Sequence, residues 1–81
     1  MKNLRVWIID WFSENGKIDK LEVEERMDEN YVESGLIDSF AFIALVAAIE
    51  EEFKISFTEE DFESESLLSI NGIISIVERR L

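Results

Sequence analysis

A chain of 81 residues can form one small domain, and its 47% apolar and 33% charged residues are typical of a folded protein. The absence of cysteine and histidine excludes disulfides, thiolate metal sites and catalysis by a Ser–His or Cys–His pair. The net charge of −11 argues against nucleic acid and anionic membranes as partners, and it favours proteins with basic patches.

The first predicted helix runs from about Lys2 to Glu14. Apolar residues at helical spacing define its buried face, and two more widen it: Leu4, Trp7, Ile8 and Trp11, then Val6 and Phe12. We interpret the two tryptophans as core residues, with a stacking or docking role as the alternative. Asn15-Gly16 is expected to end the helix, with the glycine in a left-handed cap.

A long connection from Lys17 to Ile37 follows, with a short helical turn expected over residues 20–26. Its sparse apolar residues are expected to pack onto the core: Ile18, Leu21, Val23, Met27, Tyr31, Val32, Leu36 and Ile37. Alternating segments with hairpin turns are absent, which favours an all-α fold over a sheet.

The second long helix is predicted to begin at Asp38 or Ser39, with Asp38 as its N-cap, and to run to about Phe53. One stripe of this helix is spaced to face the core: Phe42, Leu45, Val46, Ile49 and Phe53. A second stripe starts beside Ser39: Phe40, Ile43, Ala44 and Ala47.

So small a domain can hardly bury both stripes, so the second one is predicted to stay exposed as a docking surface. Burial of this stripe under the long connection is the alternative. Glu50 and Glu51 place acid at the helix end, where it is mildly unfavourable, which suggests that they offer charge to a partner.

The remaining chain predicts an extended link over Ile55–Phe57, a short helix that Thr58 caps and that ends near Phe62, and a final helix from Ile70 to about Arg80. Ser69 is expected to cap the final helix, and its buried face is predicted to consist of Ile70, Ile73, Ile74 and Val77. Gly72 is expected to allow close packing. Arg79 and Arg80 are expected to complement the helix dipole. The whole chain, 1–81, is thus predicted to be a single all-α domain: a four-helix bundle of three longer helices and one short one, with a long loop between helices one and two.

Ser39 stands where a loop meets a helix N-terminus, and amides and the helix dipole favour a phosphodiester there. Gly35 permits the turn that presents it. Asp-Ser before an apolar run is also an ordinary capping sequence, so a purely structural role for Ser39 stays open.

The order of these motifs resembles that of acyl and peptidyl carrier proteins over nearly the whole chain. The residues that carry the resemblance are Gly35, Asp38-Ser39-Phe40, Ile49-Glu50-Glu51-Glu52-Phe53 and Ile55-Ser56-Phe57. The resemblance implies that a phosphopantetheinyl transferase attaches 4′-phosphopantetheine from coenzyme A to Ser39, and that Asp38 helps to shape the transferase site. It implies a carrier of acyl or aminoacyl thioesters, with neither a catalytic nor a metal site of its own.

Fatty-acid-synthesis carriers typically have acidic residues two and five positions after the serine, where this chain has Ala41 and Ala44. The difference indicates a specialised, discrete carrier, in a lipid, polyketide or aminoacyl pathway, whose partners are a loading ligase and acyl-transferring enzymes with basic or apolar patches. The Asp-Ser-Phe form, with Phe40, resembles that of D-alanyl and some peptidyl carriers, which favours aminoacyl cargo. Carriers of fatty acids hold the chain between their helices, and the bulky Phe42 stands where small polar residues are common in them. Phe42 therefore predicts short or polar cargo.

Two other hypotheses compete with the carrier. An unmodified acidic helical adaptor would dock partners through the same stripe, with Ser39 only a cap. A calcium-binding protein is the weaker rival, because Asp28–Tyr31 lacks the alternating ligands and glycine of an EF-hand loop.

No secretory leader follows Met1, and the longest apolar run, Phe40 to Ile49, is shorter than the roughly 20 residues that span a bilayer. We therefore expect a monomeric cytoplasmic protein without a membrane span.

Overall fold

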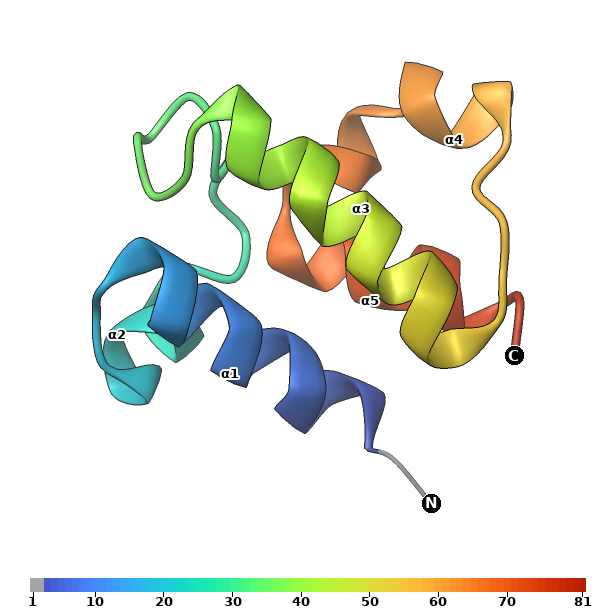
Figure 1. Cartoon of the computed structure of the whole chain (residues 1–81). Coiled ribbons are helices and arrows are strands. Elements are labelled where there is room, and N and C mark those ends of the chain that lie inside the picture. Colours follow the sequence, from blue (N-terminus) through green and yellow to red (C-terminus); the bar gives the residue numbers. More distant parts are fainter. Residues whose placement is uncertain (1–2) are drawn as a thin grey trace.

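The computed structural model describes residues 3–81, and within them it consists of helices and connections (Figure 1). The elements are α1 (Leu4–Gly16), α2 (Lys20–Glu25), α3 (Ser39–Phe53), α4 (Glu59–Glu63), the 3₁₀-helix η1 (Glu65–Leu68) and α5 (Ile70–Glu78). The all-α fold class is confirmed, and α2 is the helical turn expected in the long connection. Lys2, the predicted start of the first helix, lies outside the described residues.

The core lies where α1, α3 and α5 meet the connection between α2 and α3. α1 and α3 run in opposite directions, and α5 packs against α1 and η1 (Figure 1). The buried apolar residues of the three helices are Leu4, Ile8, Ile9, Phe12, Leu45, Ile49, Ile70, Ile73, Ile74, Ile76 and Val77. Their spacing of three and four residues explains why these segments are helices that share one interior.

The connection contributes as many buried apolar residues to the core as α5 does, and more than α1 or α3. Five of its predicted apolar contacts are buried: Val23, Met27, Tyr31, Leu36 and Ile37. Ile18 and Val32 pack against the core while partly exposed. The prediction for Leu21 was wrong, because it lies two residues before Val23 on α2 and therefore points to solvent.

Two details of α1 differ from the sequence prediction. Val6 is exposed and Ile9 is buried instead, because Val6 stands two positions from both Leu4 and Ile8 and points away from the core. The left-handed residue at the helix end is Lys17, with φ 57°, rather than Gly16. A Cβ at Gly16 would lie 2.7 Å from Leu36 Cδ1, so that glycine serves a close approach.

The predicted helix caps are confirmed for α3, α4 and α5. Asp38, Thr58 and Ser69 each accept a hydrogen bond from a backbone N–H three residues on, and Thr58 and Asp61 form a capping box. The close packing expected at Gly72 is also confirmed, because a Cβ there would lie 1.8 Å from the carbonyl oxygen of Ser66.

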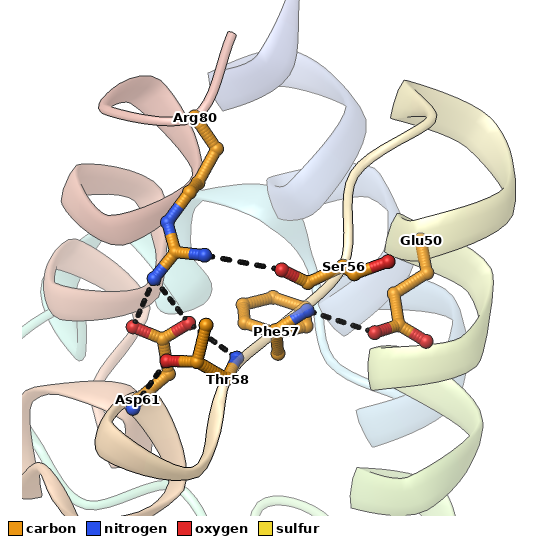
Figure 2. A network of polar contacts seen from close by, with 6 residues as sticks. All are labelled: Glu50, Ser56, Phe57, Thr58, Asp61 and Arg80. Carbon is orange, nitrogen blue, oxygen red and sulfur yellow. Dashed lines mark hydrogen bonds and ion pairs between the residues drawn. The ribbon is translucent and has the colours of Figure 1, made fainter.

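Arg80, which was expected to complement the dipole of α5, contacts residues outside that helix. Figure 2 shows its guanidinium against the carboxylate of Asp61, with Nη2 2.7 Å and 2.6 Å from the two oxygens. Its Nη1 donates to the carbonyl oxygen of Ser56 at 3.1 Å. Because Asp61 also accepts from the N–H of Thr58 at 2.9 Å, this network joins the chain end to the link between α3 and α4.

Candidate functional site

Ser39 is the first residue of α3 and is exposed to solvent. The carboxylate of Asp38 accepts from the N–H of Ala41 at 2.8 Å, which fixes the start of the helix directly before the serine. The first-turn amides of a helix have no partner one turn earlier, so the N-terminal end is electropositive. The site therefore presents an accessible hydroxyl beside groups that favour a phosphate.

The backbone before Ser39 is held in place by the connection. Gly35 has φ 81°, a conformation that side chains disfavour, and nothing lies within 4 Å of the place where its Cβ would be. Tyr31 anchors the segment, because its N–H donates to the carbonyl of Leu68 at 3.0 Å and its hydroxyl donates to the carbonyl of Leu67. Burial raises the pKa of the Tyr31 phenol well above its usual range. The loop that precedes Ser39 is thus tied to η1 through Tyr31.

The second stripe of α3 is exposed, as the sequence predicts. Phe40 is 85% exposed and Ile43 is 65% exposed, and Ala44 and Ala47 also face solvent. The connection therefore does not cover the stripe, and the alternative of burial is wrong. On the opposite side of the helix, Leu45 and Ile49 are fully buried, while Phe42, Val46 and Phe53 pack against the core.

The two acidic residues proposed for partner contact have different surroundings. Glu50 is partly buried, and its carboxylate accepts from the N–H of Phe57 at 2.9 Å, so it holds the link after α3 (Figure 2). Glu51 is exposed beside Trp7 of α1 and Ala48. Among residues 3–81, Glu51 forms no comparable hydrogen bond to the backbone.

One exposed apolar residue was missed. Phe62 on α4 is about half exposed, and its ring contacts that of Phe57 at a centroid distance of 6.1 Å. From the sequence, Phe62 is expected only as the residue near which the short helix ends. The signal in the sequence was an aromatic residue in so short a helix, because a helix of five residues can bury little of a large ring.

The interior beneath the serine is occupied by aromatic rings. Trp11, Phe12, Tyr31 and Phe42 form a continuous run, with centroid distances of 5.2, 4.9 and 6.1 Å between successive rings. Phe42 lies three residues after Ser39, so the run connects the start of α3 to α1. Rings from α1, the connection and α3 thus meet in the interior near the start of α3.

The described residues also bear on the calcium-binding alternative and on a membrane span. Across residues 3–81, no group of three or more Asp or Glu side chains is arranged to hold a metal ion. No helix in the same part of the chain is long and apolar enough to cross a membrane.

Comparison with known proteins adds a family match that spans the site. The model of the phosphopantetheine attachment site matches residues 16–74, a stretch that includes Ser39. A D-alanyl carrier protein of Lactobacillus acidophilus is 32% identical over 57 residues, which are 70% of this chain and 72% of that protein. One of Streptococcus suis is 33% identical over 54 residues, 67% of this chain and 68% of its own. No solved structure matches the chain.

Proposed function

This chain belongs to the family of carrier proteins with a phosphopantetheine attachment site, and we propose that Ser39 is that site. Members of the family hold a phosphopantetheine group, whose thiol supplies the thioester that carries the cargo. The chain is thus a carrier rather than a catalyst in its own right. The observation that carries the assignment of Ser39 is its exposed hydroxyl at the first residue of α3, inside the matched stretch.

The surroundings of Ser39 fit a phosphodiester. The amides and the dipole of a helix N-terminus stabilise negative charge. In the transfer, the Ser39 oxygen would form a bond to the phosphorus of coenzyme A that bears the pantetheine arm. The bond from that phosphorus to the nucleotide half would break, the nucleotide leaving with the electron pair and the hydroxyl proton passing to a base of the transferase.

The cargo that we propose is a small aminoacyl group such as D-alanyl. The matched relatives are named D-alanyl carrier proteins. The ring run from Trp11 to Phe42 supports this proposal, because Phe12 and Tyr31 are fully buried in the interior that a long acyl chain would have to share. Lipid and polyketide acyl groups are the alternative cargo.

The partners would be a phosphopantetheinyl transferase, an aminoacyl-loading ligase and the enzymes that take the group onward. We propose that they dock on the exposed stripe Phe40, Ile43, Ala44 and Ala47, with Glu51 offering charge. The strong negative charge favours partners with basic patches, and self-repulsion favours a monomer. We propose the cytoplasm as the place where it acts.

The direct test of the site is the intact mass after incubation with coenzyme A, magnesium and a broad-specificity transferase. The native chain should gain one phosphopantetheine, Ser39→Ala should gain none, and Ser34→Ala should behave like the native chain. Ser34 is the matched control because it is an exposed serine of the same connection. If the folded native chain gains nothing while the transferase modifies another carrier, Ser39 is only a cap and the adaptor hypothesis takes its place.

A second experiment tests the cargo. The modified protein is loaded either with D-alanine or with a long acyl chain, and the amide and aromatic NMR signals are compared. The proposal predicts that Phe12, Tyr31 and Phe42 keep their shifts with both cargoes. Widespread shifts of these core signals with the long chain would mean that it enters the interior, and would contradict a carrier built for small cargo.

A further inference from the structure

A surface groove lies at the end of α3 that is far from Ser39. Two hollows of about 400 and 320 Å³ share Trp7. One lies between α1 and α3, and the other follows α1 past Trp11. We call them together the tryptophan groove, and the residues that matter for it are Trp7, Asp10, Trp11, Glu14, Ala48 and Glu51.

The groove exists because α1 and α3 have residues of different size where they face each other. One stripe of α1 lines the groove, because its residues are three, one and three positions apart: Trp7, Asp10, Trp11 and Glu14. On the α3 side the hollow is lined by Ala48, Glu51 and Glu52, and the small methyl group of Ala48 leaves the space beside Trp7 open.

The two indoles are held firmly but are not buried. Trp7 meets the ring of Phe53 edge-to-face at 5.5 Å, and Trp11 meets Phe12 in the same manner at 5.2 Å. Ile8 and Phe12 of the same helix are fully buried, whereas Trp7 and Trp11 are only half-buried. Part of each large ring is therefore a preformed surface in contact with solvent, which lowers the entropy cost of binding.

The charge around the rings is predominantly negative. Lys20 pairs with Asp10 at 2.9 Å and also feels the charge of Glu14, while Glu14 and Glu51 form no direct ion pair among the residues that the structure describes. Lys54 stands at the α3 end of the groove. Indoles next to carboxylates form the environment that a cation prefers, and arginine suits it best because its planar, weakly hydrated guanidinium can stack on a ring and pair with a carboxylate.

We propose that the tryptophan groove docks an arginine-bearing segment of a partner enzyme, with the guanidinium over Trp7 and in reach of Glu14 or Glu51. The inference rests on the carrier function proposed above. It extends the proposed docking stripe, because Ala44, Ala47, Ala48 and Glu51 continue along one side of α3. Residue 51 lies about 18 Å from Ser39 along the helix axis, so a partner seated here can still work on the arm at Ser39.

This arrangement gives the chain a charge-based recognition site despite the alanines at positions 41 and 44. Basic partners would contact the far end of α3 together with α1, instead of the first turns after the serine. Recognition would thereby depend on an aromatic surface as well as on charge, and that combination selects against partners that offer only lysines.

The test uses the full chain and three blocked, tryptophan-free peptides that differ only in carrying arginine, lysine or neutral citrulline at two positions. The chain has two tryptophans, so its spectrum has two indole N–H signals that report directly on the groove. The arginine peptide should shift both signals saturably and bind about two- to fivefold more tightly than the lysine peptide. Equal binding of the citrulline peptide would overturn the proposal.

Matched variants separate the groove from general attraction to an acidic protein. Ala48→Leu fills the hollow, and Glu14→Gln with Glu51→Gln removes two charges; each should weaken arginine-peptide binding about fivefold or more. The control, Glu60→Gln with Glu63→Gln, removes two exposed charges from α4, which lies across α3 from α1 (Figure 1). Equal weakening by the control would refute a specific groove.

The mass gain at Ser39, measured on the same samples, reports on the carrier function independently. A chain that gains phosphopantetheine but whose indole signals ignore the arginine peptide would refute the groove and leave the carrier function intact. Indole shifts in a chain that is never modified would refute the carrier function and leave a cation-binding groove.

Discussion

Replacing Arg80 by methionine should destabilise the fold far more than the same change at its neighbour Arg79. The Arg80 guanidinium lies 2.6 and 2.7 Å from the oxygens of Asp61 and also donates to Ser56. The side chain of Asp61 is only 8% exposed, against 31% for that of Arg80. Removing the arginine therefore leaves a nearly buried carboxylate without its counter-charge.

The cost follows from what remains around that carboxylate. Breaking a fully buried ion pair costs about 3–5 kcal/mol. Here water already reaches part of Arg80, and the N–H of Thr58 still donates to Asp61 at 2.9 Å, so we expect the lower value of about 2–3 kcal/mol. In a domain of this size, such a loss corresponds to a fall in Tm of about 10–20 °C.

Urea unfolding followed by circular dichroism measures this free energy directly. Arg79→Met is the control, because Arg79 is exposed and its side chain has no partner among residues 3–81; it should change stability by less than about 0.5 kcal/mol. Equal losses in the two variants would show that general charge or the α5 dipole matters and that the Asp61 contact does not. In a double-mutant cycle, Asp61→Asn with Arg80→Met should cost less than the two single changes together.

Three further predictions concern the connection and the helix ends. Because burial raises the pKa of Tyr31 in the folded chain, the unfolded chain loses the phenolic proton at lower pH than the folded chain does. The free energy of unfolding should therefore fall as the pH rises above about 10, by up to about 1.4 kcal/mol per pH unit. In Tyr31→Phe, the urea midpoint should depend less on pH in this range. Asp38→Ala removes the acceptor of the Ala41 N–H and should cost about 1 kcal/mol in urea unfolding, whereas Asp38→Asn should cost little. Gly72→Ala should lower the thermal midpoint by the equivalent of about 1–3 kcal/mol instead of raising it as alanine does in an open helix, because its Cβ would collide with the Ser66 carbonyl.

Features that depend on a few neighbouring residues could be predicted from the sequence. Asp38 caps α3 because a carboxylate at that position reaches the amide three residues on, whatever the rest of the fold does. The two faces of α3 follow in the same way from the helical period, which places Leu45 and Ile49 opposite Phe40 and Ile43. The candidate site consists mainly of such local features, which is why the position of Ser39 at the start of α3 and the exposure of the stripe beside it could be predicted.

The errors arise where distant segments meet. Gly16 was expected to take the left-handed conformation, but Leu36 packs against it from the connection and Lys17 takes that conformation instead. The contact between Asp61 and Arg80 joins residues 19 positions apart, and no local pattern marks it. Both depend on how the connection and the link after α3 fold back onto the helices, which periodicity does not describe.

The position of the acidic residues on α3 connects the fold to recognition. Glu50 and Glu51 are adjacent in the sequence, yet Glu50 serves the link through the N–H of Phe57, and Glu51 faces the groove at Trp7. Successive positions on a helix differ by about 100° in direction, so one of two neighbouring acids can support the fold while the other meets a partner. Charge removal at Glu51 should therefore affect binding, whereas at Glu50 it should first affect stability. Under the proposed docking, these two acids would serve the fold and the partner from different directions within a single turn of α3.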